Sequence, residues 1–87
     1  MSEHKPPDEL RQMVVEALMK VPFPSMWVHN ASGKQYFVAL PPVFREEDLQ
    51  LLVVYRGSME PYFWTRPIDE FLSKFTRKRI EEPFNAF

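Results

Sequence analysis

Apolar side chains recur at helical spacing close to the start of the chain. They lie at i, i+3, i+4, i+7, i+8 and i+11, which places them in one stripe of an amphipathic helix. Prolines and acidic residues precede the stripe and suit a first helical turn, whereas Pro22 excludes the helical conformation at the residue before it. We therefore predict a helix over residues 8–20, after a loose segment over residues 1–7. The stripe comprises Leu10, Met13, Val14, Ala17, Leu18 and Val21.

Short apolar segments separated by turns follow, and they have the character of β-strands. Met26–His29 and Lys34–Leu40 are predicted strands joined by a tight turn, in which Gly33 takes a positive φ. Leu49–Arg56 is rich in Leu and Val on both faces, as expected of a strand that is covered on both sides. Tyr62–Arg66 is predicted to pair back on it as a hairpin.

The remaining segments are charged or start with proline. Arg45–Asp48 is predicted to be an exposed charged loop. Pro67 suits the first position of a helix and acidic residues follow it, so we predict a short helix over residues 67–75. Residues 76–87 are predicted to be a tail, with the basic cluster Arg77–Arg79 near its start.

This order of elements predicts a mainly β fold with helices. The 87 residues are expected to form a single domain, because a chain of this size cannot build two cores. Short strands in so few residues commonly curl into a small barrel, since closure removes exposed edges. We predict a small SH3-like antiparallel β-barrel over residues 26–66, flanked by the N-terminal amphipathic helix and the short C-terminal helix. An α+β fold with helices on a flatter sheet is the second choice.

Composition narrows the classes of function. The net charge of −1 argues against a nucleic-acid partner, which normally binds a strongly basic face. Cysteine is absent, so disulfides and thiolate chemistry are excluded. The polar, proline-rich start lacks the apolar segment of a signal peptide, and no apolar run approaches the roughly 20 residues that span a bilayer. We therefore expect a cytoplasmic protein that does not enter a membrane.

A pair of arginines and several aromatic residues flank the predicted hairpin. With a turn over residues 57–61, Arg56 falls nearly opposite Tyr62. Trp64 and Arg66 then follow Tyr62 on the same face of the strand. A guanidinium beside aromatic rings can stack on them and hold a carboxylate or phosphate through paired hydrogen bonds. The predicted ligand-binding residues are Tyr55, Arg56, Trp64 and Arg66.

The same residues have a structural alternative. In it, the arginines form ion pairs with nearby carboxylates and the indole belongs to the core. The alternative pairs are Arg66 with Asp69 or Glu70 and Arg56 with Glu60 or Glu46, with Trp64 buried.

Residues suited to catalysis or metal binding are sparse. His4 and His29 are the only histidines, and neither has neighbouring ligands in the sequence that would form a metal site. His29 is predicted to be a hydrogen-bonded turn residue. The adjacent carboxylates Glu46–Asp48 and Glu81-Glu82 belong to charged runs, and only two glycines occur, which excludes a phosphate-binding loop. We expect no metal, no cofactor and no catalytic activity.

A block of residues resembles a known family signature. Leu52-Val53-Val54-Tyr55-Arg56, Trp64-x-Arg66-Pro67 and Phe71 resemble the Val-Val-Tyr-Arg…Trp-x-Arg-Pro…Phe signature of a family of short bacterial and phage proteins, catalogued as a domain of unknown function. The segment from Gly33 to Val38 is similar to that family's Gly-x-x-Tyr-x-Val strand, so the resemblance covers residues 33–75. Met26–His29 departs from the family's usual Tyr-Arg-His-Tyr-like opening. The resemblance implies a compact β-barrel-like fold and no particular reaction.

These observations favour two functions. The first is a small non-catalytic binding module whose groove takes an anionic or nucleotide-like ligand. The second is a phage-type regulatory or anti-defence protein that inhibits a host protein by direct contact. Eight Phe, three Tyr and two Trp give the chain a high aromatic content, and this content, with Phe84 and Phe87 near the C-terminus, also fits a homodimer.

Overall fold

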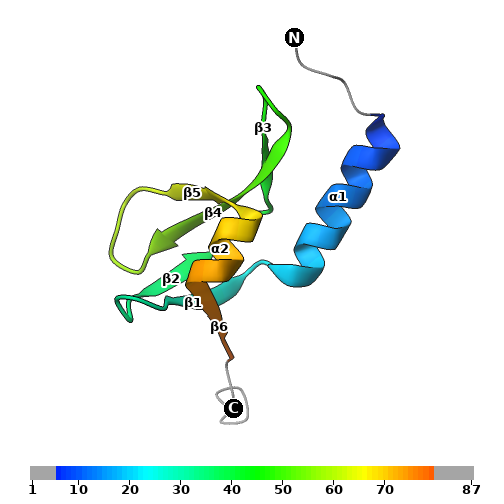
Figure 1. Ribbon diagram of the computed structural model, residues 1–87. Helices are drawn as coiled ribbons and strands as arrows, with labels where there is room; N and C mark the ends of the chain where they lie inside the picture. Colours follow the sequence, from blue (N-terminus) through cyan, green and yellow to red (C-terminus); the bar gives the residue numbers. More distant parts are fainter. Residues whose placement is uncertain (1–5, 80–87) are drawn as a thin grey trace.

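The computed structural model describes residues 6–79, which form one antiparallel sheet and two helices (Figure 1). The predicted mainly β class with helices is confirmed at this level. The elements are α1 (Pro7–Lys20), β1 (Ser25–His29), β2 (Gln35–Val38), β3 (Val43–Arg45), β4 (Gln50–Gly57), β5 (Trp64–Pro67), α2 (Ile68–Lys74) and β6 (Phe75–Lys78).

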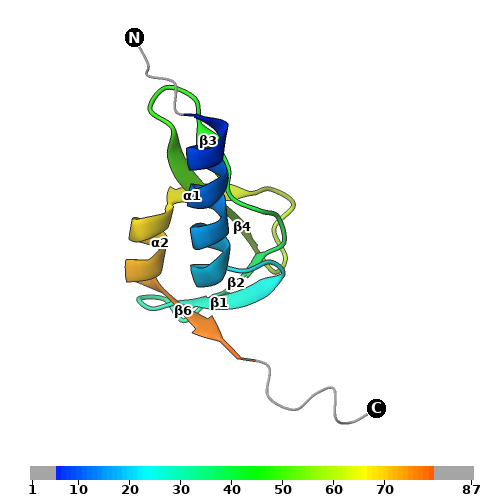
Figure 2. The ribbon, with the colours of Figure 1, turned by 90° about the vertical axis from the view of Figure 1, so that its right-hand side faces the viewer.

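The predicted N-terminal helix is confirmed as α1, which begins one residue earlier than expected, at Pro7. Proline fits this first position because its missing N–H would have no partner there. The helix ends where the N–H of Val21 donates to the carbonyl of Ala17 at 2.7 Å. Ala17 and Val21 are buried, so the C-terminal end of α1 packs on the sheet, while Figure 2 shows the helix running alongside it.

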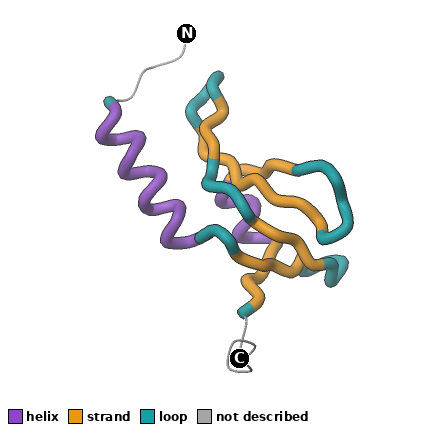
Figure 3. The backbone as a smooth tube through the Cα atoms, turned by 180° about the vertical axis from the view of Figure 1, so that it is seen from behind, coloured by secondary structure: helices purple, strands orange, loops and turns teal. Residues whose placement is uncertain are grey.

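Two predicted hairpins are confirmed. β1 and β2 pair through a turn in which Gly33 has a φ of 78°, a conformation that glycine adopts without strain. β4 and β5 pair in a register that sets Tyr55 opposite Trp64. The loop between them, visible in Figure 3, covers residues 58–63.

Two strands were not predicted. Val43–Arg45 forms β3, which pairs with the start of β4, so Arg45 belongs to a strand and the predicted loop is a tight hairpin connection. So short a segment has no alternating pattern of its own, and its pairing with β4 makes it a strand. Phe75–Lys78 forms β6, which pairs with β1, so the predicted tail begins with a strand. The rest of that tail, residues 80–87, and most of the predicted loose segment, residues 1–5, lie outside the described residues.

The predicted closed barrel is not found. The strands follow the order β3-β4-β2-β1-β6, β5 pairs with β4, and β5 and β6 do not pair with each other. The short helix α2 joins β5 to β6 and contacts both strands, so it occupies the opening that a closed sheet would bridge with hydrogen bonds (Figure 1). The sheet therefore keeps an open seam between β5 and β6.

An aromatic core holds the sheet against α2. Phe71 of α2 is fully buried and stacks on Phe75 with the ring centres 4.3 Å apart. Trp27 packs edge-on against Phe71, and its Nε1 donates to the buried Oγ of Ser25 at 2.8 Å, so its polar atom is satisfied. The other buried members are Val21, Val38, Val53 and Tyr55.

Neither of the two described helices is long and apolar enough to cross a membrane.

Candidate functional site

A pocket of about 200 Å³ opens at the seam between β5 and β6. Five strands contribute to it, β3 being the exception, and five of its six lining side chains are aromatic rings or an imidazole. The sixth is an arginine. The lining residues are His29, Tyr36, Tyr55, Trp64, Arg66 and Phe75.

Three of the four predicted site residues meet in this pocket. Tyr55 of β4 lies opposite Trp64 of β5. Arg66 lies two residues after Trp64, opposite Val53, which lies two residues before Tyr55. Because side chains alternate between the faces of a strand, Tyr55, Trp64 and Arg66 share the inner face of the hairpin. The predicted convergence of an indole, a phenol and a guanidinium is therefore present.

Arg56 does not belong to this group. It pairs with Phe37 of β2 and lies on the outer face, where its Nη1 donates to the carbonyl of Glu60 at 2.8 Å. The prediction placed the turn at residues 57–61, whereas the loop extends to residue 63 and pairs Tyr55 with Trp64. A shift of one residue in register moves a side chain to the opposite face, which explains the error.

Arg66 is held by two contacts at the pocket wall. Its Nε donates to the hydroxyl of Tyr55 at 2.9 Å, and its Nη1 donates to the carboxylate of Glu70 at 2.7 Å. The guanidinium also lies over the Phe75 ring, 5.8 Å from its centre. Of the structural alternatives, the ion pair with Glu70 is confirmed. Within residues 6–79, Nη2 of Arg66 has no hydrogen-bond partner, so this nitrogen can still donate to a ligand.

Burial and hydrogen bonding determine the charge states of this pair. Burial raises the pKa of the Tyr55 phenol, and the hydrogen bond from Arg66 offsets only part of that rise. Partial burial opposes the charge of Arg66, but the hydrogen bond to Tyr55 and the nearby Glu70 outweigh it and raise the pKa of Arg66. At neutral pH the phenol is therefore neutral, accepts from Arg66 and retains its own proton for donation.

Trp64 is not a core residue, because 48% of it is exposed. Its Nε1 donates to Oε1 of Glu60 at 2.9 Å, and Tyr62 packs edge-on against it with ring centres 5.5 Å apart. The same carboxylate oxygen accepts from the N–H of Gly57 at 3.0 Å. A Cβ at Gly57 would lie 2.9 Å from Glu60, so glycine permits this close approach. Glu60 thus fixes an exposed indole at the pocket rim.

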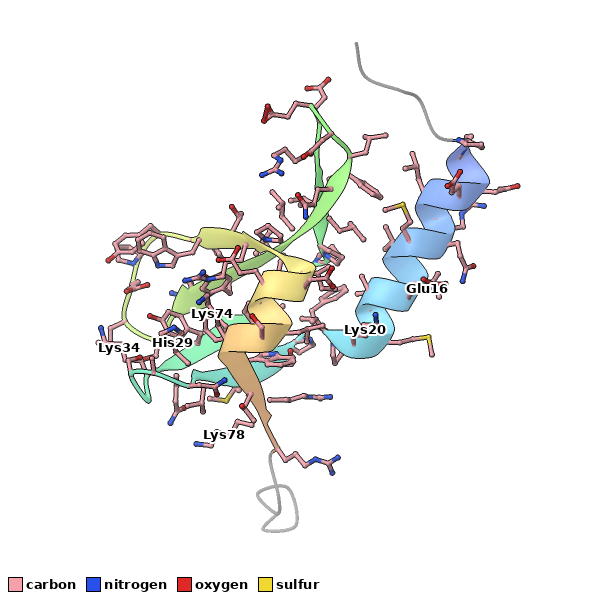
Figure 4. The ribbon with its side chains drawn as sticks, viewed as in Figure 1. Glu16, Lys20, His29, Lys34, Lys74 and Lys78 are labelled. Atoms are coloured by element: carbon pink, nitrogen blue, oxygen red, sulfur yellow. The ribbon has the colours of Figure 1, made fainter. Side chains whose placement is uncertain are left out.

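His29 completes the opposite side of the pocket. Its Nδ1 is 2.9 Å from Oγ of Ser32, which confirms the prediction of a hydrogen-bonded turn residue. The ring also packs on Phe75 at 5.0 Å between centres. The backbone N–H of His29 donates to the carbonyl of Lys34, and the N–H of Asn30 donates to the carbonyl of Lys74. Two lysines therefore lie next to this end of β1 (Figure 4).

Sequence reasoning missed His29, Tyr36 and Phe75 as pocket residues. Tyr36 had been predicted as a strand residue and Phe75 as part of a helix, and the pairing of β1 with both β2 and β6 brings them together. Such pairings are non-local, so no pattern within one segment indicates them. The aromatic content of the chain was the only available signal.

The charged loop lies apart from this pocket. Arg45 pairs with Asp48 at 2.7 Å, and this contact lowers the pKa of Asp48. Glu46 and Glu47 are exposed, as predicted for a solvated charged run. Among residues 6–79, no group of three or more histidine or carboxylate side chains is arranged to hold a metal ion.

Comparison with known proteins adds no relative. No protein-family model matches the chain, and no curated protein or solved structure gives a match. The fold and the pocket together define a small β-rich domain with an aromatic, arginine-containing cavity at an open sheet seam. The resemblance to the bacterial and phage family stays a prediction.

Proposed function

We propose that this protein is a small non-catalytic binding module, and that its seam pocket takes an anionic or nucleotide-like ligand. The observation that carries this proposal is the convergence of Arg66, Tyr55 and Trp64 on one open pocket. Arg66 and Tyr55 offer hydrogen-bond donors to an anion, and the half-exposed indole of Trp64 offers a surface for a planar ring.

The size of the pocket limits the ligand. Ligand cavities typically measure about 300–1,000 Å³, and this pocket measures about 200 Å³. It can enclose one ring or one phosphate, with the rest of the ligand on the rim near Lys34 and Lys74. A mononucleotide or a small aromatic acid satisfies this limit better than a dinucleotide does.

The charge of the pocket also favours an anion over a cation. Arg66 already lies over the Phe75 ring, so a ligand cation would meet a guanidinium on that ring face. The carboxylate of Glu70 binds Arg66 and balances its positive charge. Nη2 of Arg66 remains able to donate a hydrogen bond to a ligand. Lys34 and Lys74 accept backbone hydrogen bonds from His29 and Asn30, so both lysine side chains start near this end of the pocket.

We also propose that the sheet is an open variant of an SH3-like barrel in a cytoplasmic protein. Support comes from the connectivity: β1 pairs with β2, β2 pairs with β4, β4 pairs with β3 and β5, and after a short helix the last strand returns to pair with β1. The resemblance to the Val-Val-Tyr-Arg family of short bacterial and phage proteins points to a compact β-barrel-like fold as well. Fold alone does not assign function, so the pocket residues remain the basis of the proposal.

Thermal melting with three probes tests the binding function. Adenosine 5′-monophosphate should raise the melting temperature by mass action on the folded state, whereas adenosine or inorganic phosphate alone should raise it less. Arg66→Gln should remove the shift. Arg45→Gln is the matched control, because Arg45 also pairs with a carboxylate but lies far from the pocket. A mononucleotide shift that persists in Arg66→Gln, or the absence of any shift with all three probes, would overturn the proposal.

A second candidate function rests on the loop before β5. Met59 is 91% exposed, and Tyr62 and Phe63 beside it are half-exposed, so the loop presents apolar side chains to solvent. Such a patch suits the alternative of a phage-type regulatory or anti-defence protein that inhibits a host protein. It would also suit a homodimer, which sedimentation would detect. A stoichiometric partner retained by the protein but not by Met59→Ser/Phe63→Ser would support inhibition by contact.

A further inference from the structure

The outer face of the sheet carries a row of side chains that neither helix covers. Met26 lies opposite Lys78 of β6 on one side and opposite Phe37 of β2 on the other. Phe37 in turn lies opposite Arg56 of β4. Directly paired residues share a face, so Lys78, Met26, Phe37 and Arg56 form one row across four strands. With strands about 4.8 Å apart, the row spans about 14 Å.

Two surface hollows adjoin this row and share a residue. One hollow of about 350 Å³ is bordered by Met26, Lys78 and the cations on either side of Lys78, which are Arg77 and Arg79. The other, of about 190 Å³, is bordered by Met26, Phe37 and Arg56. Met26 borders both, so the two hollows lie next to each other across the strands, and we call the pair of hollows the furrow.

Positive charge gathers at both ends of the furrow. Within residues 6–79, Arg77, Lys78 and Arg79 make no ion pair or side-chain hydrogen bond. Lys78 lies in the outer row opposite Met26, whereas Arg77 lies opposite the buried Trp27, so Arg77 and Arg79 border the hollow from the edge of the sheet. At the other end, the guanidinium of Arg56 lies 6.0 Å from the centre of the half-exposed Phe63 ring. The net charge of −1 does not reveal this concentration, because six of the twelve acidic residues lie on α1 and the β3–β4 connection.

We propose that this furrow binds a short run of single-stranded nucleic acid. Cations at both ends match a chain that carries one negative charge per nucleotide. Between and beside them, Phe37 and Phe63 offer ring faces on which bases stack, and Arg56 can stack in the same manner. An acidic peptide would use the cations but has no planar group to place on the rings. A duplex would need an element that enters a groove, and this sheet face has none among the described residues.

The row of this surface and the seam pocket lie on opposite faces of the sheet, and Tyr36 borders both the pocket and one hollow of the furrow. Arg56 and Phe37 point to the outer face, whereas Tyr55 and Tyr36, their neighbours in the chain, line the inner pocket. Lys78 and Phe37 do not line the pocket, so variants at these two positions leave its lining residues unchanged. Binding of mononucleotides and binding of single strands can fail independently.

Fluorescence anisotropy with labelled twelve-nucleotide oligothymidylate and oligouridylate tests the proposal on the full chain. The protein should bind at low salt and lose affinity as salt rises. Lys78→Gln should weaken binding several-fold. It should also reduce the slope of the logarithm of the binding constant against the logarithm of salt concentration by about one. Phe37→Leu keeps an apolar side chain in this half-buried position and should weaken binding about tenfold through lost stacking. Arg11→Gln on α1 is the control and should bind like the wild type.

Four results would overturn the proposal. These are no binding of either strand at low salt, equal binding by Phe37→Leu and wild type, tighter binding of a duplex of the same length, and full competition by polyglutamate at equal charge. The last result would assign the furrow to an acidic peptide. Thermal melting of each variant shows whether it is folded. Arg66→Gln should bind the strands normally, which separates this result from the test of the seam pocket.

Discussion

The residue on which the seam pocket depends most is Arg66. Its guanidinium joins the phenol of Tyr55 to the carboxylate of Glu70 and still has a nitrogen for a ligand. The ion pair is partly exposed, with 29% of the Arg66 side chain and 45% of the Glu70 side chain accessible. Ion pairs of this kind contribute about 0–1 kcal/mol to stability, because solvent screens them. The arginine is therefore expected to matter more for binding than for folding.

Urea denaturation of Arg66→Gln tests this division of roles. We expect a cooperative transition and a loss of about 1 kcal/mol, since Tyr55 keeps a polar neighbour and Glu70 is solvated. A variant that fails to fold would show instead that the arginine is structural.

Glu60 sets the position of the other key pocket residue, Trp64. Hydrogen bonds from the Trp64 indole and from the Gly57 N–H lower the pKa of Glu60. A lowered folded-state pKa means that the stabilisation is complete at neutral pH, above the unfolded-state value. It is lost as the pH falls through the lowered pKa of Glu60, which lies below the ordinary glutamate value of 4.5.

The indole N–H resonance of Trp64 should report this titration. We expect it to move as the pH falls through the lowered pKa of Glu60, and to occupy a shifted position at neutral pH in Glu60→Gln. The buried indole of Trp27, which donates to Ser25, is an internal control. A Trp64 resonance that is the same in Glu60→Gln and the wild type would contradict the role of Glu60.

At the scale of elements, β6 was not predicted from the sequence, although it pairs with β1 and supplies a core residue. Phe75, its first residue, is buried against Phe71 and belongs to the core, while its later residues are exposed and basic. The helical spacing of Ile68, Phe71, Leu72 and Phe75 gave a correct reason to expect a helix. It could not show that the chain leaves the helix at Phe75 to pair with β1.

Truncation of Phe75 tests the importance of β6. Phe75→Ala should lower the free energy of unfolding by about 3–5 kcal/mol, because it leaves a cavity beneath Phe71. Phe63→Ala, at a half-exposed position, should cost less than about 1 kcal/mol. If urea denaturation gave similar losses for the two variants, β6 would not be part of the core.

Much of the element order could be predicted, and the relation between elements could not. Pro7 and Pro22 marked the ends of α1, and Gly33 marked the β1–β2 turn, because these residues act through local backbone geometry. The face occupied by Arg56 depended on one residue of register in the 58–63 loop, which no local signal specifies. The site was accordingly predicted in part: Tyr55, Trp64 and Arg66 meet, and Arg56 points away.

The whole molecule places two different surfaces on the two faces of one sheet. The inner face ends in an aromatic pocket at the seam that α2 leaves between β5 and β6. The outer face carries a furrow with cations at both ends. The open seam makes the pocket possible, since a closed sheet would replace it with strand pairing.

The most direct test of the central claim uses the two tryptophans in one experiment. Trp64 lies at the pocket rim and Trp27 lies in the core with 3% exposed, so their indole N–H resonances distinguish the two locations. On titration with adenosine 5′-monophosphate, we predict a saturable shift of the Trp64 resonance, no shift of the Trp27 resonance, and loss of the response in Arg66→Gln. A Trp64 resonance that does not move at millimolar nucleotide, or that moves equally in Arg66→Gln, would contradict a ligand pocket at the seam.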